Sequence, residues 1–367
     1  MVIAIDLTSL SYHITGIERY ALCITEKLLM IDNENRYILV FRNEIYSSLS
    51  NYVDGERIIA RILHGDNKLL FNQIVLPVVL YGIKADVFLF MAFTSPILFI
   101  NRKIVTTIHD MVAWDYSQAL SFLQKIYCRI GCTISACIAW KIITVSEFSK
   151  KRITDILKVN HRKIYVVPSA ISDSFEQNSQ CQYIDVKQKY KLPDNYIMTL
   201  STLEPRKNMS LLLDAFENIA EKVDYNLVIV GRKGWKIDNL LSKIETQNKI
   251  CVTGFVEDKE VIEIYKNSMC FVFPSAYEGF GLPPVEALSL GTPVISSDAA
   301  SMPEVLRKQA VYFKSGNMNE LQDLLLKLSK NVNNMPCELD DYQKNNYRFD
   351  VSAKKVLSIL MDEAVKN

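Results

Sequence analysis

The sequence predicts an α/β protein with two domains, each a parallel sheet covered by helices. Short runs rich in Val, Ile, Tyr and Phe alternate with longer segments in which apolar residues return every three or four positions. This alternation is typical of parallel strands joined by helical crossovers. The chain has 367 residues, which is too long for one ordinary hydrophobic core and suitable for two.

Six segments in each half of the chain have the length and composition of strands. In the first half they are 1–7, 37–41, 85–90, 103–110, 141–146 and 163–169. In the second half they are 195–202, 226–231, 249–254, 269–275, 292–298 and 310–313. Helical periodicity is clearest in 17–31, 210–223, 258–268 and 320–332. Ligands of open α/β sheets bind outside the carboxyl ends of the strands, and we expect two such edges to face each other across a cleft.

A polar stretch marks the expected boundary between the domains. Residues 172–191 are rich in Gln, Asn and Asp and lack strand character, so the linker is placed at 173–191. The first domain is then expected to span residues 1–172 and the second residues 192–349.

Composition argues for a globular protein without a general affinity for nucleic acid. Hydrophobic residues make up 49% of the chain, charged residues make up 23%, and the net charge is +1. The apolar segment 1–10 is interrupted by Asp6 and has no basic lead, so we do not expect a secretory signal. The apolar run 130–140 is well short of the roughly 20 residues that cross a bilayer. A cytoplasmic location is therefore expected.

Metal-binding patterns are missing from the sequence. The eight cysteines include no C-x-x-C pair and the four histidines are scattered, so we expect reduced core cysteines and no zinc site. The sequence also contains no Asp-x-Asp triplet of the kind that clamps a metal-diphosphate complex. We expect neither a metal nor any other cofactor.

The segment 274–303 contains the most informative pattern in the chain. Glu278 and Glu286 lie on either side of a glycine turn that opens into a helix, and this turn reads Gly279, Phe280, Gly281 and Leu282. Glycine lets the backbone approach a ligand closely, and the two prolines that follow suit a first helical turn. Free N–H groups and the positive end of the helix dipole would bind a diphosphate there. From residue types alone, an ordinary helix entry with two solvated acids is the alternative.

The order of residues in 277–298 resembles the Glu-x7-Glu signature of the retaining family four glycosyltransferases, enzymes of the GT-B fold with two Rossmann-like domains. The resemblance covers nearly the whole chain and is densest from Tyr196 to Val305. It implies that Glu278 is catalytic beside the donor sugar and that Glu286 binds the nucleotide ribose. It also implies that the sugar and phosphates meet the backbone of Gly279, Phe280, Gly281 and Leu282.

Two loops that precede helices resemble the phosphate-binding loops of the same family. Gly16 follows the first expected strand, and many family members have a second glycine where this chain has Glu18. Arg206 and Lys207 follow the first strand of the second domain, and Lys207 matches the family's lysine. Two adjacent cations would neutralise a diphosphate leaving group as its bond breaks.

The remaining candidate residues stand at other expected strand ends. Gly231 and Phe255 lie where the family holds the nucleotide base. His109 and Asp110 end a buried strand, and such a pair is either positioned beside a reacting sugar or merely a satisfied surface pair. The resemblance favours a catalytic role for both, with the histidine near the donor sugar and the acceptor path. Residues 350–367 resemble the family's C-terminal helix, which crosses back to the N-terminal domain.

The resemblance implies a retaining, metal-independent hexosyltransferase of polysaccharide (O-antigen) assembly. GDP-mannose is the first donor candidate, and a lipid-linked glycan is the expected acceptor. A UDP- or dTDP-sugar-dependent transferase and a GT-B sugar-nucleotide epimerase are the enzymatic alternatives. A catalytically silent carbohydrate-binding subunit is the third reading, and the presence of Lys207 and both glutamates disfavours it.

A local excess of cations predicts peripheral contact with an anionic membrane. Residues 141–163 contain seven cations and two acids in a protein of nearly zero net charge. Each cation near an anionic bilayer contributes about 1 kcal/mol, so salt-sensitive binding at the inner face of the cytoplasmic membrane is expected. A solvated helix face is the alternative interpretation of this segment.

Overall fold

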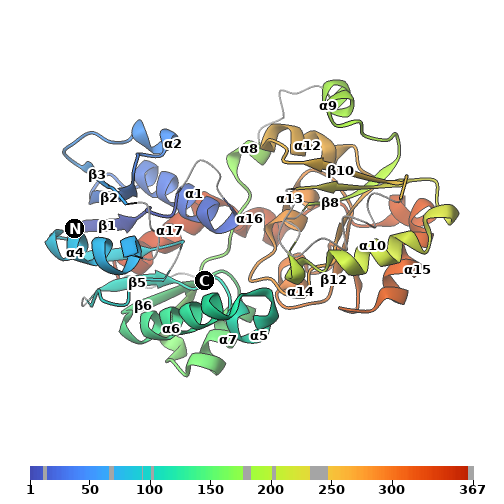
Figure 1. The fold of residues 1–367 in the computed structure, drawn as a ribbon. Coiled ribbons are helices and arrows are strands. Elements are labelled where there is room, and N and C mark those ends of the chain that lie inside the picture. Colours follow the sequence, from blue (N-terminus) through green and yellow to red (C-terminus); the bar gives the residue numbers. More distant parts are fainter. Residues whose placement is uncertain are drawn as a thin grey trace. The chain divides into compact units, whose positions relative to one another are not determined.

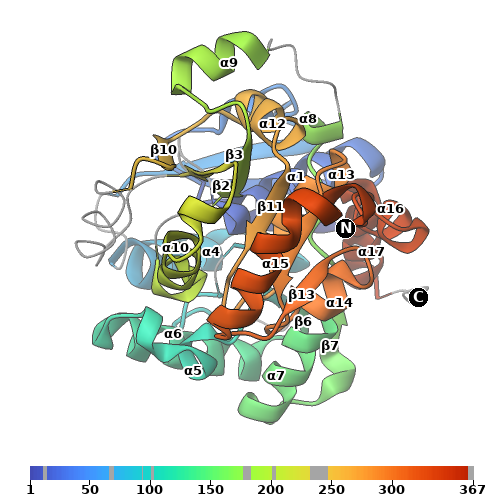
Figure 2. The same cartoon turned by 90° about the vertical axis from the view of Figure 1, so that its right-hand side faces the viewer.

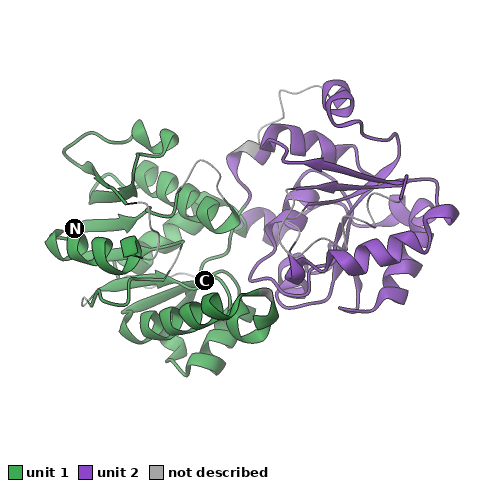
Figure 3. Cartoon of the chain, in the orientation of Figure 1, with its two compact units in different colours: residues 1–170, 346–367 green, residues 171–345 purple. Residues whose placement is uncertain are grey.

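The chain forms two compact units, shown in different colours in Figure 3. The computed structural model describes residues 1–10, 15–65, 70–92, 94–100, 103–176, 183–200, 204–231 and 247–362. Unit 1 consists of Met1–Ala170 together with Asn346–Asn367, and unit 2 consists of Ile171–Asn345. Each unit is built around its own parallel sheet.

Unit 1 contains a seven-stranded parallel sheet in the order β3-β2-β1-β4-β5-β6-β7. Its strands are β1 (Val2–Asp6), β2 (Arg36–Arg42), β3 (Ile58–Leu63), β4 (Val87–Phe90), β5 (Ile104–Thr107), β6 (Lys141–Thr144) and β7 (Ile164–Val166). Six of them confirm the strands expected in the first half of the chain. Edge strand β3 was not anticipated, because only its first residue is fully buried and the apolar run is interrupted by Arg61.

Helices cover both faces of this sheet (Figure 1). They are α1 (Gly16–Ile31), α2 (Ser47–Ser50), η1 (Phe71–Val75), α4 (Leu76–Gly82), α5 (Val112–Asp115), η2 (Ser117–Ala119), α6 (Phe122–Ile138), α7 (Glu147–Leu157), η3 (His161–Lys163) and α17 (Phe349–Leu360). One core cluster joins Leu76 and Leu80 of α4 to Phe88 and Phe90 of the sheet, and Ile138 of α6 packs against the same cluster. Helices α4 and α6 therefore cover the same face.

Helix α17 belongs to unit 1 although it follows unit 2 in the sequence. It packs against α1, and Tyr20 and Phe349 meet edge to face with ring centroids 6.5 Å apart. Ser352 Oγ donates to the carbonyl of Pro168 at 2.9 Å. The buried Lys141 Nζ donates to the carbonyl of Ile359 at 2.8 Å. These contacts tie residues after 346 to the sheet of unit 1.

Unit 2 contains a six-stranded parallel sheet in the order β10-β9-β8-β11-β12-β13. Its strands are β8 (Tyr196–Leu200), β9 (Asn226–Val230), β10 (Ile250–Gly254), β11 (Cys270–Phe273), β12 (Val294–Ser297) and β13 (Val311–Phe313), and all six were expected. Its helices, seen from a second side in Figure 2, are α8 (Asp173–Glu176), α9 (Tyr183–Tyr190), η4 (Pro205–Lys207), α10 (Met209–Glu217), η5 (Ala220–Lys222), α12 (Asp258–Lys266), α13 (Leu282–Ser289), α14 (Met302–Leu306), α15 (Met318–Asn331), η6 (Val332–Asn334) and α16 (Asp341–Asn346).

The segment expected to be a linker, 173–191, differs from a simple connection. It contains α8 and α9, and both helices contact α12 within unit 2. Glu260 of α12 accepts hydrogen bonds from Lys189 at 2.6 Å and from Tyr190 at 2.7 Å, while Val186 is buried. The sequence did not predict α9, because most of its side chains are polar and either face solvent or pair with one neighbour. Residues 177–182 of the expected linker lie outside the described part of the chain.

Candidate active site

Strand order brings most of the expected donor-binding residues to one edge of the unit 2 sheet. Strands β10, β9, β8 and β11 are consecutive neighbours and run parallel, so the loops after them lie at the same edge. These loops carry Phe255, Gly231, the cation pair Arg206 and Lys207, and the segment 274–281, respectively.

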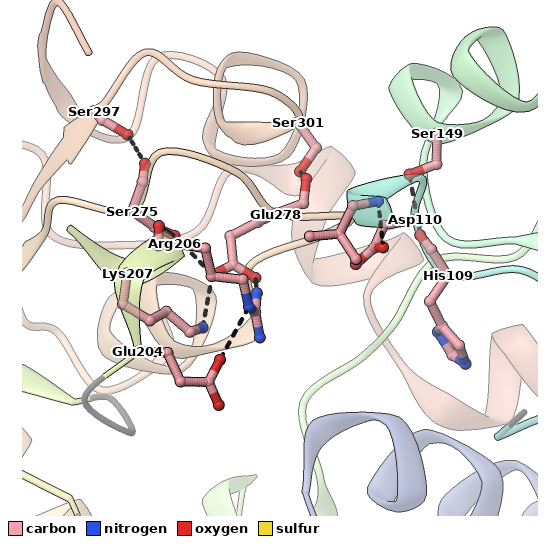
Figure 4. Close-up of polar contacts among 11 residues, drawn as sticks. His109, Asp110, Ser149, Glu204, Arg206, Lys207, Ser275, Glu278, Ser297 and Ser301 are labelled. Atoms are coloured by element: carbon pink, nitrogen blue, oxygen red, sulfur yellow. Dashed lines mark hydrogen bonds and ion pairs between the residues drawn. The ribbon is translucent and has the colours of Figure 1, made fainter. Parts of the chain in front are cut away.

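Glu278 is the centre of a buried charge cluster at this edge (Figure 4). Its Oε1 accepts a hydrogen bond from Lys207 Nζ at 2.6 Å, and its Oε2 accepts one from Arg206 Nη1 at 2.9 Å. Arg206 Nε is also 3.2 Å from Glu204 Oε2. The side chain of Glu278 is only 10% exposed and that of Lys207 only 14% exposed. Two cations and two carboxylates are thus packed together where a diphosphate was expected.

The surroundings of Glu278 keep its carboxyl group ionised. Burial on its own would raise the pKa of Glu278, but the charges of Arg206 and Lys207 and the hydrogen bonds from Lys207 and Ser275 outweigh it and hold the pKa at about 2. Burial lowers the pKa of Lys207, and the charge of Glu278 opposes that shift. At neutral pH Glu278 is therefore a fixed negative charge and not a proton donor.

Three serines hold the loop that carries Glu278. Ser275 Oγ donates to Glu278 Oε1 at 2.8 Å, and Ser301 Oγ donates to the carbonyl of Glu278 at 3.0 Å. Ser297, at the end of β12, donates to the carbonyl of Ser275 at 2.5 Å. The amide of Ala276 donates to the carbonyl of Arg206 at 2.8 Å. The β8 and β11 loops are thus joined by backbone contacts as well as by the ion pairs.

Gly281 is required by the geometry of the turn into α13. It has φ +82°, and a Cβ atom placed there would lie 2.3 Å from Cε of Met302. A residue with a Cβ at this position would have a strained left-handed backbone, and the end of the Met302 side chain would have to move. Gly279 and Phe280 precede it, and Leu282 is the first residue of α13. Phe280 is buried, so its side chain supports the turn while its backbone remains the ligand-facing part in the expected role.

Glu286 lies on α13 one turn after Leu282, and it is buried with 5% of its surface exposed. A carboxylate in such a position is not the solvated helix-entry acid of the alternative interpretation. Glu278 and Glu286 therefore lie on either side of the glycine turn.

Gly231 and Phe255 lie at neighbouring strand ends. The amide of Gly231 donates to the carbonyl of Gly254 at 3.0 Å, so the ends of β9 and β10 are in direct contact. Phe255 follows Gly254 and is 56% exposed. An exposed aromatic ring beside a glycine turn is a suitable flat surface for a nucleotide base. Gly234, also noted in the sequence, lies outside the described residues.

His109 and Asp110 lie in unit 1, just after β5, and their contacts are also drawn in Figure 4. His109 Nε2 is 2.7 Å from the carbonyl of Met91, which can only accept, so Nε2 carries the proton. Burial lowers the pKa of His109, although that hydrogen bond and Asp110 oppose the shift. The neutral ring then presents Nδ1 as an acceptor. Asp110 accepts from the amide of Val112 at 3.0 Å and fixes the loop after β5.

Gly16 is the first residue of α1 in unit 1. Thr15 and Glu18 form a capping box at this helix start, and the amide of Thr15 donates to Glu18 Oε2 at 2.7 Å. A Cβ atom at Gly16 would meet nothing within 4 Å. The carboxylate of Glu18 is thus used to cap the helix, and packing does not require a glycine at position 16.

Sequence reasoning missed Glu204 and the serines that support Glu278. Glu204 stands two residues before Arg206, and such spacing in a loop gives no reason to expect a contact. Ser275 lies three residues before Glu278, the spacing of a side-chain contact in a tight turn, so it could have been anticipated. Ser301 is 23 residues away, and only the adjacency of β11 and β12 brings it near.

The cations of segment 141–163 are mostly engaged within unit 1. Lys141 is buried and pairs with Asp362 at 2.6 Å, and Lys163 Nζ donates to the carbonyl of Ala136 at 2.6 Å. Arg152 Nη2 pairs with Asp115 Oδ1 at 2.5 Å. Much of the local positive charge is therefore already balanced or buried. Within the described parts of the chain, no helix is long and apolar enough to cross a membrane.

Residues 183–348 match the family described as glycosyl transferases group 1. The matched range contains the glutamate pair and the cation pair of the charge cluster: Arg206, Lys207, Glu278 and Glu286. The described residues contain no group of three or more His, Cys, Asp or Glu side chains that could hold a metal ion.

Curated relatives of the chain include several O-antigen mannosyltransferases. It is 33% identical over 211 residues to O-antigen chain mannosyltransferase B of Escherichia coli, an alignment that covers 56% of this chain and 55% of that protein. It is 29% identical over 267 residues to O-antigen chain mannosyltransferase RfbU of Salmonella typhimurium, covering 71% of this chain and 69% of that protein. The chain thus spans only about half the length of the first of these relatives.

Solved structures of glycosyltransferases share the whole architecture. A glycosyltransferase from Rickettsia africae superposes with a TM-score of 0.69 at 18% identity, covering 98% of both chains. The Anabaena protein HepE, crystallised with UDP and glucose, superposes with a TM-score of 0.75 at 16% identity, covering 99% of this chain and 100% of that one. The fold is GT-B, with two Rossmann-like parallel-sheet domains, as the sequence predicted.

Proposed function

We propose that the protein is a retaining glycosyltransferase that moves a hexose from a nucleotide diphosphate sugar to a glycan acceptor. The observation that carries the proposal is the buried cluster of Glu278, Arg206 and Lys207 beside a glycine turn and helix start. In the proposed reaction, the bond between the sugar C1 and the diphosphate oxygen breaks and a bond from C1 to an acceptor hydroxyl forms on the same face. The acceptor proton leaves with the nucleoside diphosphate.

Arg206 and Lys207 are proposed to take up the charge of the leaving diphosphate. Without a ligand, Glu278 forms ion pairs with both cations. A diphosphate with about two negative charges would bind the same cations alongside Glu278, and its developing charge would be stabilised by the cations and by the amides near Gly281. No metal ion has a part in this proposal, because cationic side chains perform the same electrostatic task.

The carboxylate of Glu278 is proposed to act on the sugar. With a pKa of about 2 it stays ionised, so it serves as a hydrogen-bond acceptor and as a negative charge beside the positive charge that develops on the ring. Glu286 is proposed to bind the ribose, and Gly231 and Phe255 the base. In unit 1, Gly16 is assigned to the phosphates, and His109 with Asp110 to the sugar and acceptor.

GDP-mannose is the proposed donor, and a lipid-linked glycan at the inner face of the cytoplasmic membrane is the proposed acceptor. The mannosyltransferase relatives support this choice of sugar. The UDP in the HepE structure favours the main alternative, a UDP-sugar-dependent transferase. An epimerase would instead convert or hydrolyse a UDP-sugar without any acceptor.

A thermal-shift panel with GDP, UDP, dTDP and ADP tests the donor site. A ligand that binds only the folded protein adds about 2.7 kcal/mol of stability at a hundredfold excess over its dissociation constant. We expect the largest shift with GDP, and little shift in the Lys207→Ala variant. A larger shift with UDP or dTDP would replace the proposed donor by the alternative, and no shift with any nucleotide would remove the donor-site assignment.

A further inference from the structure

Exposed apolar side chains are concentrated on one part of unit 1. Among the described residues, nineteen large apolar side chains are exposed, and twelve of these lie within residues 70–130. They belong to η1 and α4, to the loop 98–100 and to α6. We call the exposed apolar side chains of residues 70–81, 98–100 and 122–130 the outer apolar surface. Scattered exposed apolar residues are normal, whereas a concentration of this size marks an interaction site.

Helix α6 exposes its large apolar residues and buries small ones, which is the reverse of the usual pattern of a surface helix. The residues that it buries against unit 1 are small, namely Gly131, Ser135 and Ala136. Phe122 is 74% exposed and Leu123 is 77% exposed. Ile126, Tyr127 and Ile130 continue the exposed stripe at helical spacing. The side that packs against the unit is thus less hydrophobic than the side that points away from it.

The segment formed by η1 and α4 is apolar on both faces. Leu76 and Leu80 are buried in the core of unit 1. Val78 is 69% exposed and Tyr81 is 58% exposed, and residues 70–83 include no charged side chain. A helix that is apolar all round is normally covered on both sides. In unit 1 only one side is covered.

Gln73 joins these elements into one continuous surface. Its Nε2 donates to the hydroxyl of Tyr127 on α6 at 2.9 Å, and its Oε1 accepts from the amide of Ile97 at 2.9 Å. Tyr81 Oη lies 3.1 Å from the carbonyl of Leu98 and 3.0 Å from the amide of Ile100. Figure 1 shows α4 and α6 on the same side of the unit 1 sheet. The three segments therefore present their apolar side chains together.

The segments that carry the outer apolar surface have charges of one sign. Residues 70–84, 94–109 and 122–138 contain no Asp or Glu, but they include Lys84, Lys103, Lys125 and Arg129. An apolar surface formed by segments whose charged side chains are all basic is complementary to an anionic bilayer, which offers hydrocarbon below a layer of negative headgroups. A symmetric dimer through the same surface would instead bring the cations of these segments in both copies together.

We propose that the outer apolar surface is a docking site for an anionic lipid bilayer. Helix α6 lies in the headgroup layer with Phe122 and Leu123 inserted, and Val78 of α4 inserts beside it. This surface replaces segment 141–163 as the proposed membrane contact, since Lys141, Arg152 and Lys163 of that segment are engaged inside unit 1. The proposal stands apart from the proposed glycosyl transfer, since docking needs neither donor nor acceptor.

Co-sedimentation with vesicles tests the proposal on the full chain without any nucleotide. We expect binding to phosphatidylglycerol–phosphatidylethanolamine vesicles and much less to phosphatidylcholine vesicles. Leu123→Glu and Val78→Glu should each lower the partition coefficient by about tenfold or more, because an inserted apolar side chain becomes charged. Both positions are exposed, so the circular dichroism melt should not change.

Two control variants and one further measurement complete the test. Leu326→Glu places the same charge on a 40% exposed leucine of unit 2 and should leave binding unchanged. Lys151→Glu, on α7, should lower binding less than either surface variant. Loss of binding in Lys151→Glu together with full binding in Leu123→Glu would overturn the proposal. Light scattering that shows a dimer which Leu123→Glu converts to a monomer, without vesicle binding, would assign the surface to self-association instead.

Discussion

At the scale of single residues, Glu278 is held by two cations, and this arrangement determines what its carboxylate can do. Lys207 and Arg206 each occupy one of its oxygens, and Ser275 donates a third hydrogen bond. A group held in this way is ionised before any substrate arrives, so it does not depend on a proton transfer to become active. Its substitution should therefore affect the chemical step and the stability of the loop, and not the affinity for a nucleotide.

Substitutions of the two glutamates are expected to have different effects, one on nucleotide binding and the other on turnover. Glu286→Gln should weaken binding of the free nucleoside diphosphate by roughly ten- to hundredfold, because a hydrogen bond to a charged acceptor is lost. Glu278→Gln should leave that affinity intact and lower kcat, because its interaction with the ring strengthens only as charge develops. Calorimetric titration followed by turnover measurement checks both.

Glu338→Gln is a suitable control for this pair, since its side chain is 74% exposed and pairs with Lys344 at the surface. This variant should change neither the affinity for the nucleoside diphosphate nor kcat. If Glu278→Gln loses nucleotide affinity while Glu286→Gln keeps it, the roles are reversed. If neither variant differs from the control, the turn is not the donor site.

The charge cluster should also make stability depend on pH. Glu278 has an ordinary pKa of 4.5 and a pKa of about 2 in the folded protein, so the folded state binds its proton less readily. Its contribution is therefore fully present above about pH 5 and is lost as the pH falls toward 2. On the order of 1–3 kcal/mol is involved, after allowance for the cost of burying Lys207.

Thermal melts of the wild type and Glu278→Gln at pH 7, 5 and 3 measure this contribution. The variant should melt several degrees lower at pH 7, and the difference should shrink at pH 3, because Glu278 is then protonated in the unfolded chain while the folded protein still holds it ionised. A constant difference across this range would mean that the carboxylate titrates normally and that the cluster is not a stabilising element.

At the scale of secondary-structure elements, the strands were predictable and several helices were not. Buried parallel strands are short continuous apolar runs, and this signal is hard to miss when both faces of the sheet are covered. Helix α6 escaped prediction because its large apolar residues face outward and small ones face inward, so its pattern does not mark a core face. Helix α9 escaped because its composition resembles that of a linker.

Part of the candidate site could be predicted because its residues sit at strand ends. The glutamates, the cation pair and the glycine turn all follow buried strands, and parallel strands bring their ends to one edge. The direct contact between Arg206 and Glu278 could not be predicted, because it joins residues 72 positions apart through the adjacency of β8 and β11.

Gly281 provides a test of the turn that begins α13. Gly281→Ala should destabilise unit 2 by roughly 2–4 kcal/mol, because it combines a left-handed backbone with a clash against Met302. Gly291→Ala is the matched control: its φ is +80°, but a Cβ there would meet nothing within 4 Å. The control should show only the smaller cost of backbone strain. Chemical denaturation measures both variants.

Shortening Met302 separates the clash from the strain. Adding Met302→Ala to Gly281→Ala should cost less than the sum of the two single changes, because the shortened side chain makes room for the new methyl group. Additive losses would show that the contact with Met302 does not restrict this position.

At the scale of the whole molecule, the proposed chemistry needs no metal. Turnover should be unchanged after treatment with EDTA, because Arg206, Lys207 and the helix amides carry the charge of the leaving group. Loss of activity in EDTA, followed by recovery with manganese or magnesium, would show that the diphosphate is held by a metal ion.

The architecture as a whole was predicted because two sets of parallel strands require two domains. The position of the last helix came from resemblance, since periodicity in residues 348–360 predicts a helix but not the unit on which it packs. The three-dimensional contacts of Ser352 with Pro168 and of Ile359 with Lys141 help to assign it to unit 1.

This connectivity bears on how the protein is made. During synthesis, residues 1–170 leave the ribosome first, but the face of α1 that α17 covers stays open until residues 346–362 have emerged. Unit 2 has all of its residues earlier and can complete its sheet while unit 1 is still waiting. We therefore expect unit 2 to complete its fold before unit 1, while the side of α1 that α17 covers, including Tyr20, stays exposed until α17 has docked.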